Sequence, residues 1–300
     1  MCLAGVWEEV PKQNVILKSL QKMLLIKDPL ALYEDFYDYI GEKDMFVFSE
    51  KKALEWEDVF PFLYLMAEFE DIEENQSVKH LVIDEMQDYT PIQFAVINKL
   101  YPCQKTILGD FGQVLHPCHH HALDETRRMY PDAEFVVLNK SYRSTYEIMD
   151  FAKKICHQPS LEMVERHGER PRTIYCENME HEIASIAALI KQFETGENVS
   201  LEIVVKTEAE AGRYYELLSG EHSVHLISRD SIRFTNGISI MSIRMAKGLE
   251  FDEVIVPDAD DRNYSSEFDR NLLYIACTRA MHKLTLLYTG NPTPFLSKQV

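Results

Sequence analysis

The stretch HLVIDEMQDYTPIQ, at positions 80–93, is the feature that most limits what this chain can fold into. A short apolar run at 81–83 ends in two adjacent carboxylates, Asp84 and Glu85, and Pro91 then opens a helical pattern. Adjacent carboxylates at the end of a buried strand are costly to desolvate unless a cation or hydrogen bonds engage them. The stretch therefore predicts a strand that delivers two acids to a polar edge.

Two interpretations of the acid pair are open at this point. In the first, Asp84 holds Mg²⁺ and Glu85 orients an attacking water, as acids in this position do in phosphoryl-transfer enzymes. In the second, the pair is a solvated feature of a strand end, which is a common arrangement. The choice depends on the rest of the chain.

Length and charge limit the class of protein. The 300 residues can bury one large or two medium cores, and we expect two domains. The formal net charge of −18 excludes nucleic-acid binding by the surface as a whole, so any such contact needs a local basic groove. The six cysteines are scattered without CxxC spacing, and no apolar run is long enough to span a membrane. We therefore expect a cytoplasmic chain with free thiols and no membrane partner.

The order of patterns predicts an α/β fold with parallel sheets behind an N-terminal helical segment. Residues 1–77 are predicted to be helical, over 15–27, 30–40 and 56–69, with a break at Pro29. From position 79, apolar runs alternate with helical patterns. The predicted strands are 81–83, 105–108, 134–138, 173–176, 202–205, 224–227, 238–243, 253–256 and 283–288. The predicted helices are 92–100, 122–129, 144–156, 182–193, 208–218 and 268–280. We place a domain boundary near 140–145.

A second polar cluster follows the next strand. The sequence TILGDFGQVLHP places Asp110 at the end of a strand and Gln113 three residues later. Open α/β sheets bind ligands at the carboxyl ends of their strands, and Gly109 and Gly112 permit a close backbone approach. A neutral amide such as that of Gln113 can contact a phosphate or position water. For a single GDxxQ string, an ordinary Gly–Asp turn is the simpler interpretation.

Three further clusters lie towards the carboxyl terminus. In LNKSYRSTYEI, Tyr142 and Arg143 precede a helix whose N-cap is Ser144 or Thr145; the arginine can bind a phosphate and the tyrosine can stack on a base. In KGLEF, at 247–251, a glycine between a lysine and an acid lets backbone N–H groups approach an anion. In RNLLYIACTRA, Arg279 lies near the end of a helix, where a single arginine most simply pairs with a surface acid.

Taken together and in this order, the five clusters resemble those of superfamily 1 helicases of the UvrD/Rep/PcrA type. The resemblance covers roughly residues 78–290 and rests on the DExQD, GDxxQ, YRS, KGLEFD and LLYxAxTRA strings. It implies RecA-like P-loop NTPase sheets: a helical segment at 1–77, part of domain 1A at 78–143 and a complete domain 2A at 144–300.

The resemblance also implies a role for each motif residue. Asp84 would bind Mg²⁺, and Glu85 would activate water. Gln113 would contact the γ-phosphate of ATP, and Tyr142 would stack on adenine. Arg143 and Arg279 would act as arginine fingers, and Gly248 and Glu250 would touch phosphate and ribose. Asp88, Asp110 and Lys247 would belong to the network that couples the two domains.

The spacing of the motifs narrows the resemblance. UvrD and Rep carry a large insertion between the YRS and KGLEF motifs, whereas only about a hundred residues, from position 143 to position 247, separate them here. This compact arrangement, with IDEMQDYTPIQF and EFDEVIV, is more similar to the HelD group, which includes helicase IV-like and RNA-polymerase-recycling members.

The sequence departs from the family in three respects. It contains no GxxxxGK[ST], the loop that cradles the β-phosphate, so we expect either part of a longer protein or a truncated relative, inactive by itself. Arg244 stands where the family usually has a histidine. The region after GDxxQ reads HPCHHH, at 116–121, where UvrD-type proteins place a tryptophan that stacks on single-stranded DNA. These neighbouring Cys and His residues cannot all converge on one tetrahedral metal ion.

Two functions therefore follow from the sequence. The first is the C-terminal portion of an ATP- and Mg²⁺-dependent DNA helicase, with single-stranded DNA as its partner. The alternative is a non-catalytic pseudo-helicase that binds RNA polymerase or a repair complex. The acidic charge and the missing tryptophan favour the alternative, whereas the joint presence of Asp84, Glu85, Gln113, Arg143 and Arg279 favours the enzyme lineage.

Overall fold

The computed structural model describes residues 28–48, 53–69, 73–110, 113, 123–156, 162–228, 231 and 236–296. The helix predicted over 15–27, Gly112 and the run at 116–121 lie outside these residues. The chain divides into two compact units, Met1–Leu108 (unit 1) and Gly109–Val300 (unit 2). The division into 1–77, 78–143 and 144–300 stays a prediction, because compactness alone does not define RecA-like domains.

Unit 1 begins with a small helical body built around Tyr33. Its elements are α2 (Pro29–Ile40), the short 3₁₀ helix η1 (Lys43–Met45) and α3 (Trp56–Phe69). The predicted break at Pro29 coincides with the start of α2, where Pro29 occupies the first turn and its missing N–H costs nothing. The Tyr33 hydroxyl donates to the buried Asp58 carboxylate at 2.7 Å and so ties α2 to α3.

The rest of unit 1 is a two-stranded parallel sheet with one connecting helix. Strands β1 (His80–Ile83) and β2 (Gln104–Ile107) pair in register, and η2 (Met86–Asp88) and α4 (Pro91–Leu100) lie between them in the chain. Thr90 and Gln93 form a capping box at the start of α4, directly before Pro91. Asp84 thus follows the carboxyl end of β1, as predicted.

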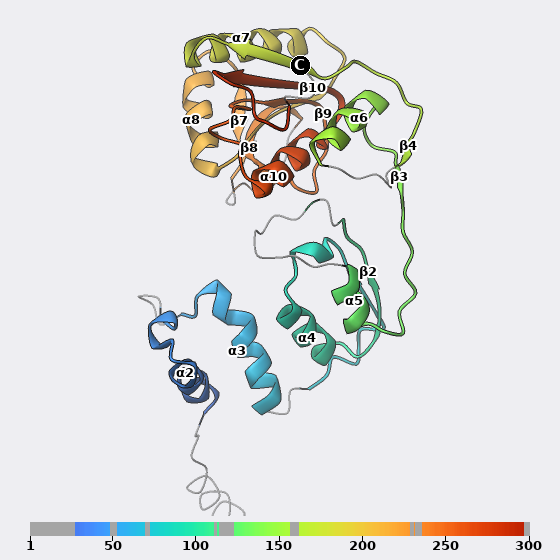
Figure 1. Ribbon diagram of the computed structural model, residues 1–300, viewed down its shortest axis with the longest axis vertical. Coiled ribbons are helices and arrows are strands. Elements are labelled where there is room, and N and C mark those ends of the chain that lie inside the picture. Colours follow the sequence, from blue (N-terminus) through green and yellow to red (C-terminus); the bar gives the residue numbers. More distant parts are fainter. Residues whose placement is uncertain are drawn as a thin grey trace, which may run out of the picture. The chain divides into compact units, whose positions relative to one another are not determined.

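Unit 2 contains a parallel sheet of six strands in the order β5-β10-β9-β6-β8-β7 (Figure 1). Its central strands are buried over nearly their whole length, which is typical of parallel strands covered on both faces. The strands are β5 (Arg172–Cys176), β6 (Ser200–Val205), β7 (Val224–Leu226), β8 (Gly237–Ser242), β9 (Phe251–Val256) and β10 (Ala280–Thr289).

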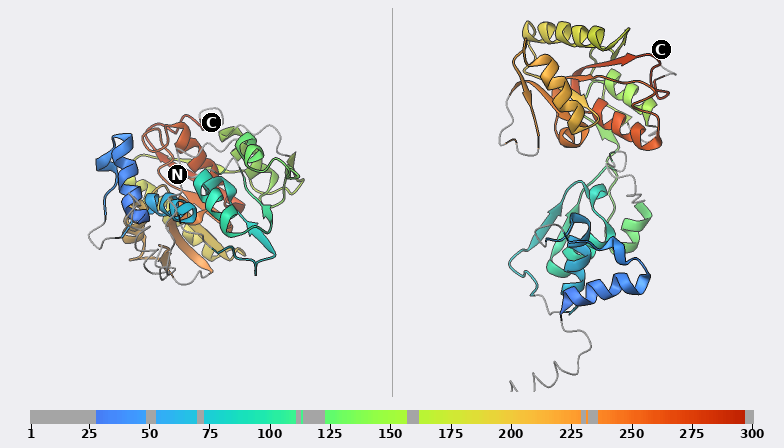
Figure 2. Two further views of the ribbon diagram at one scale, coloured as in Figure 1. Left: turned by 90° about the horizontal axis from the view of Figure 1, so that it is seen from below. Right: turned by 90° about the vertical axis from the view of Figure 1, so that its left-hand side faces the viewer.

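Helices cover both faces of this sheet, as Figures 1 and 2 show. Helices α7 (Met179–Glu194) and α8 (Glu208–Leu218) pack on one face. Helices α6 (Tyr146–Ile155), α9 (Ile243–Ala246) and α10 (Glu267–Cys277) pack on the other. The α/β class with parallel sheets is therefore confirmed, and each face of the sheet has its own hydrophobic core.

One predicted strand of unit 2 was wrong, and one predicted helix ends earlier than expected. Residues 134–138 form no strand, and Val136, Val137 and Leu138 are exposed, because no strand among the described residues pairs with them. The helix predicted over 268–280 ends at Cys277, because Ala280 already begins β10. The remaining elements are α5 (Leu123–Met129) and a short parallel pair, β3 (Lys140–Ser141) with β4 (Glu162–Met163). Among the described residues, no helix combines the length and apolarity that crossing a membrane requires.

Candidate functional site

The acid pair of unit 1 lies in a strained turn. Asp84 is exposed, and its carboxylate accepts a hydrogen bond from the backbone N–H of Glu85 at 2.8 Å. Glu85 has a φ of 53°, in the left-handed region that non-glycine residues rarely adopt. Such strain is often found at functional sites, where it fixes the direction of a side chain.

Gln87 is a member of this turn whose role the sequence analysis missed. Its side chain is fully buried, and its amide donates to the Glu85 carboxylate at 2.6 Å. This hydrogen bond fixes one carboxylate oxygen of Glu85. The strained turn sets the direction of the other oxygen. The available signal was its position two residues after Glu85 in the DEMQD string.

Arg279 is the largest fully buried side chain of the described residues. This buried position is not the surface position that a single arginine near a helix end suggested. Its guanidinium donates to the Ile275 carbonyl at 3.1 Å, the Leu249 carbonyl at 3.2 Å and the Gln113 side-chain oxygen at 2.8 Å. The TRA motif thus contacts both the KGLEF and the GDxxQ motifs.

Gln113 is the centre of this network. Its side-chain amide donates to the Asp110 carboxylate at 2.9 Å, and its backbone carbonyl accepts a hydrogen bond from the Lys247 ammonium at 2.6 Å. Asp110, Gln113, Lys247 and Arg279 therefore form one connected group within unit 2. Four residues that the sequence placed in three separate motifs are brought together.

Arg143 and Glu250 form an ion pair with each other. Both were predicted to touch the nucleotide, and in the structure each neutralises the other. Tyr142 next to them is 68% exposed, so its ring is accessible for stacking. The structure therefore places the YRS motif beside the KGLEF motif.

A buried serine holds the YRS motif in this position. Ser144 is not the N-cap of α6; that residue is Thr145, whose side chain makes no capping bond. Instead the Ser144 hydroxyl donates to the Ala280 carbonyl at 2.6 Å. This bond connects the segment after Arg143 to the residue after Arg279. The sequence analysis named Ser144 and Thr145 as N-cap candidates but did not predict the hydrogen bond between Ser144 and Ala280.

Gly248 adopts a φ of 80°, between Lys247 and the Leu249 carbonyl that accepts from Arg279. A side chain at this position would be strained, so the turn requires glycine. Lys247, Gly248 and Arg279 thus place an ammonium group, backbone and a guanidinium group near the amino ends of β9 and β10. Groups of this kind recognise the oxygens of a phosphate.

The carboxylates of the site could hold one divalent cation through few protein ligands. No group of three or more metal-ligating side chains occurs among the residues that the structure describes. A single carboxylate such as Asp84, completed by phosphate oxygens and water, is how Mg²⁺ is usually held in nucleotide sites. The residues therefore fit Mg²⁺ bound together with a nucleotide and do not fit a dedicated metal cage.

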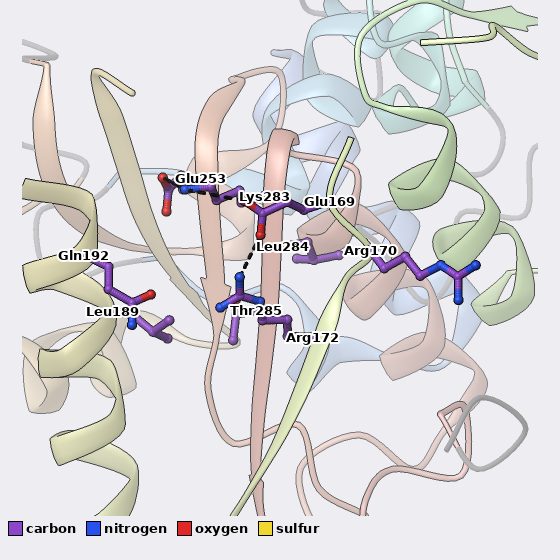
Figure 3. Close-up of a pocket in the computed structure, with 9 residues that line it drawn as sticks. All are labelled: Glu169, Arg170, Arg172, Leu189, Gln192, Glu253, Lys283, Leu284 and Thr285. Carbon is purple, nitrogen blue, oxygen red and sulfur yellow. Dashed lines mark hydrogen bonds and ion pairs between the residues drawn. The ribbon is translucent and has the colours of Figure 1, made fainter. Parts of the chain in front are cut away.

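A small cavity elsewhere in unit 2 offers no rival site (Figure 3). It measures about 30 Å³ and lies beside the Lys283–Glu253 ion pair of 3.0 Å, with Glu169, Arg172 and Leu189 in its wall. That volume holds about one water molecule. It contains none of the predicted site residues and is far too small for a nucleotide.

Two comparisons with known proteins gave a match. Residues 237–287, which contain the KGLEF motif and Arg279, match the family model of the UvrD-like helicase C-terminal domain. The crystal structure of the C-terminal domain of a possible DNA helicase from Lactobacillus plantarum is also similar. The likeness covers 52% of this chain and 92% of that one, at 35% identity and a TM-score of 0.46. No curated protein matches the chain.

Proposed function

Because this chain carries a UvrD-like helicase C-terminal domain, we propose that it is part of an ATP-dependent superfamily 1 DNA helicase. ATP would be hydrolysed between a RecA-like domain 1A and the domain 2A formed by 144–300. The compact spacing between Arg143 and Lys247 supports membership of the HelD group. The expected partner is single-stranded DNA, with RNA polymerase or repair proteins as further candidates, in the cytoplasm.

The observation that carries this proposal is the environment of Arg279. A fully buried guanidinium loses its hydration, so it needs fixed acceptors, and here these come from the two other motifs that belong to the same chemistry. Because the carbonyl of Leu249 and the helix carbonyl of Ile275 hold its position, the group is preorganised. Such a cation can stabilise charge on a transferring phosphoryl group without reorganisation.

Each motif residue has a task that its structural environment supports. Asp84 would hold Mg²⁺, which when bound neutralises phosphate charge. Glu85, oriented by Gln87, would accept the proton of the attacking water. The side-chain amide N–H of Gln113, which here donates to Asp110, would donate to a γ-phosphate oxygen. The exposed ring of Tyr142 would stack on adenine. Glu250, now paired with Arg143, would release that arginine when the nucleotide binds.

The phosphate loop is the part that these residues do not supply. No GxxxxGK[ST] occurs in the sequence, and none of the site residues above can replace its ring of backbone N–H groups. We propose that the β-phosphate cradle comes from residues outside these 300, so that this chain contributes the water, γ-phosphate and arginine parts of the site.

The proposal is tested by DNA-stimulated phosphate release from Mg²⁺–ATP by the protein as it occurs in its own cells. Glu85→Gln and Arg279→Lys should each lower turnover by at least about 10²-fold, the effect of removing one preorganised electrostatic group. Arg172→Lys is the matched control, because Arg172 pairs with exposed Glu169 outside the site. Turnover that survives Arg279→Lys would contradict the role given to this arginine.

A further inference from the structure

A crevice of about 620 Å³ lies at the carboxyl end of the six-stranded sheet of unit 2, and we call it the carboxyl-end crevice. Its wall is built by segments that follow four neighbouring strands of this parallel sheet, β5, β10, β9 and β6. Glu177 follows β5, Thr289 ends β10, Asp258 and Asp260 follow β9, and Glu210 lies on α8, the helix after β6. The KGLEF motif and Arg279 lie at the opposite, amino end of the strands and do not line it.

The order of the strands places the crevice where ligands usually bind. The connections after β5 and β6 run to α7 and α8 on one face of the sheet, whereas the connection after β9 runs to α10 on the other face. Strands β6 and β9 are neighbours, so the chain leaves them in opposite directions. Open α/β sheets bind ligands in the crevice at such a point, and about 300–1,000 Å³ is a usual volume for a ligand site.

The two helix starts in the wall are already occupied by acids. Helix N-termini generally attract anions such as phosphate. Here the first turn of α7 contains Glu180 and Glu182, and the first turn of α8 contains Glu208 and Glu210. An anionic ligand would therefore meet carboxylates at both helix starts. The usual occupant of this part of an α/β fold is disfavoured.

The arginines of the wall are held by acids of the same wall. Arg213 donates to the Asp258 carboxylate at 2.6 Å, and Arg262 donates to the Asp260 carboxylate at 3.1 Å. These bonds engage one nitrogen of each guanidinium group, which has five N–H donors in all. The side chains of Arg213 and Arg262 are 50% and 74% exposed. Both arginines can therefore donate to a further acceptor in the crevice.

The charge of the wall selects a cationic ligand. It carries four carboxylates and two guanidinium groups, an excess of two negative charges. No group of three or more metal-ligating side chains occurs in the described part of the chain, so these acids form no metal cage. A polynucleotide would bring further phosphates against them. A guanidinium or ammonium group balances the excess, and a backbone carbonyl beside it accepts from the arginines. A polypeptide with basic residues supplies both groups.

We propose that the carboxyl-end crevice docks a short extended segment of a protein partner that carries arginine or lysine. The basic side chains of the segment would pair with Glu177 and Glu210. Its backbone carbonyls would accept hydrogen bonds from Arg213 and Arg262. This docking uses the end of the sheet away from Arg279 and needs no ATP, so its failure leaves the proposed function standing, and the reverse also holds.

The test measures the fluorescence anisotropy of the capped peptide Gly-Arg-Gly-Lys-Gly-Arg-Gly, labelled with a neutral dye, on addition of the full chain without nucleotide. Binding should saturate and should weaken with salt. The same peptide with glutamate at its three basic positions should not bind. Spermidine, a cation without carbonyl groups, should not displace the basic peptide at an equal concentration. Lack of binding by the basic peptide, equal binding of the acidic one or displacement by equimolar spermidine would overturn the proposal.

Two pairs of variants separate docking from nonspecific attraction to an acidic chain. Glu177→Gln with Glu210→Gln removes the excess charge of the wall, and glutamine at position 210 preserves the capping box of α8. This pair should weaken peptide binding by at least about tenfold. Glu194→Gln with Glu216→Gln is the matched control, because it removes the same charge from exposed positions in the last turns of α7 and α8. Equal affinities of the two double variants, with circular dichroism intact, would contradict docking at the crevice.

Discussion

The motif residues of unit 1 lie at the carboxyl end of a strand, whereas those of unit 2 lie at the amino ends of their strands. In unit 1, Asp84 and Glu85 follow the carboxyl end of β1, in a sheet of two strands. In unit 2, the KGLEF motif and Arg279 precede the amino ends of β9 and β10, in a sheet of six. The acids therefore lie at an accessible strand end, whereas the arginine is enclosed by a complete core.

The exposed Asp84 and the buried Arg279 show two ways of holding a charged side chain. A carboxylate that binds a hydrated cation can stay close to water, so Asp84 is exposed. A guanidinium that must keep one orientation benefits from burial, provided that fixed carbonyls replace its water. The contacts of Arg279 meet this requirement, and the first prediction tests it.

The largest effect is expected when Arg279 is replaced by leucine. The change leaves the Leu249 and Ile275 carbonyls without their donor inside the core, so the free energy of unfolding of unit 2 should fall by about 3–5 kcal/mol. Urea unfolding followed by circular dichroism measures this fall. The exposed Arg172→Leu should change stability by about 0.5 kcal/mol or less. Equal effects of the two variants would show that Arg279 is not held as described.

A buried acid in unit 2 should make its stability depend on pH. Glu182 of α7 is fully buried; it accepts hydrogen bonds from the Asp258 backbone N–H at 2.9 Å and the Tyr214 hydroxyl at 3.3 Å. Burial is the main cause that raises the pKa of its carboxyl to about 7. Between its ordinary pKa and about 7 the folded state keeps a proton that the unfolded state has lost, so stability falls as pH rises through this window.

The fall should reach about 3 kcal/mol at most, and Glu182→Gln should remove most of it. Urea unfolding at pH 5 and pH 8 compares the two chains. The variant should be more stable than the parent at pH 8 and similar at pH 5. A parent chain that gains stability between these values would have the opposite sign and would refute the assignment.

The two sheets should respond differently to the same substitution. Val204 in β6 is fully buried and Val82 in β1 is 61% exposed. Val204→Thr puts a hydroxyl into the core and should cost about 2 kcal/mol, whereas Val82→Thr should cost about 0.5 kcal/mol or less. Urea unfolding again gives both values. A large cost at Val82 would mean that β1 is covered in solution.

The smallest effect concerns the strain at Glu85. Glycine adopts its φ of 53° without penalty, whereas Glu85→Ala keeps the strain. Both changes remove the proposed base and the acceptor of the buried Gln87 amide, so Glu85→Gly should leave unit 1 more stable than Glu85→Ala by about 1 kcal/mol. Thermal unfolding of both variants gives the comparison, and equal midpoints would indicate that the turn stores no strain.

The sequence predicted most of the fold, for identifiable reasons. Capping boxes such as Thr90/Gln93 and continuous apolar runs such as 203–205 are local signals, and the elements that carry them were found. The strand predicted over 134–138 was wrong, because an apolar run becomes a strand only when another strand pairs with it. The helix over 56–69 was found although Pro61 lies inside it.

The site was predictable as a set of residue types but not as a set of contacts. Motif order indicated Gln113, Lys247 and Arg279, yet their hydrogen bonds join positions more than a hundred residues apart and depend on the crossover of unit 2. The Arg143–Glu250 ion pair and the Ser144–Ala280 hydrogen bond also join positions more than a hundred residues apart. The roles proposed for these residues stay predictions until activity is measured.

The central claim is that this chain supplies the acid and arginine parts of an ATP site and lacks the phosphate loop. The most direct test measures phosphate release from Mg²⁺–ATP with single-stranded DNA by these 300 residues alone, with and without Glu85→Gln. The account predicts no release above background in either case. Turnover that Glu85→Gln abolishes would contradict it, because it would mean that the chain holds the β-phosphate with residues that no motif identifies.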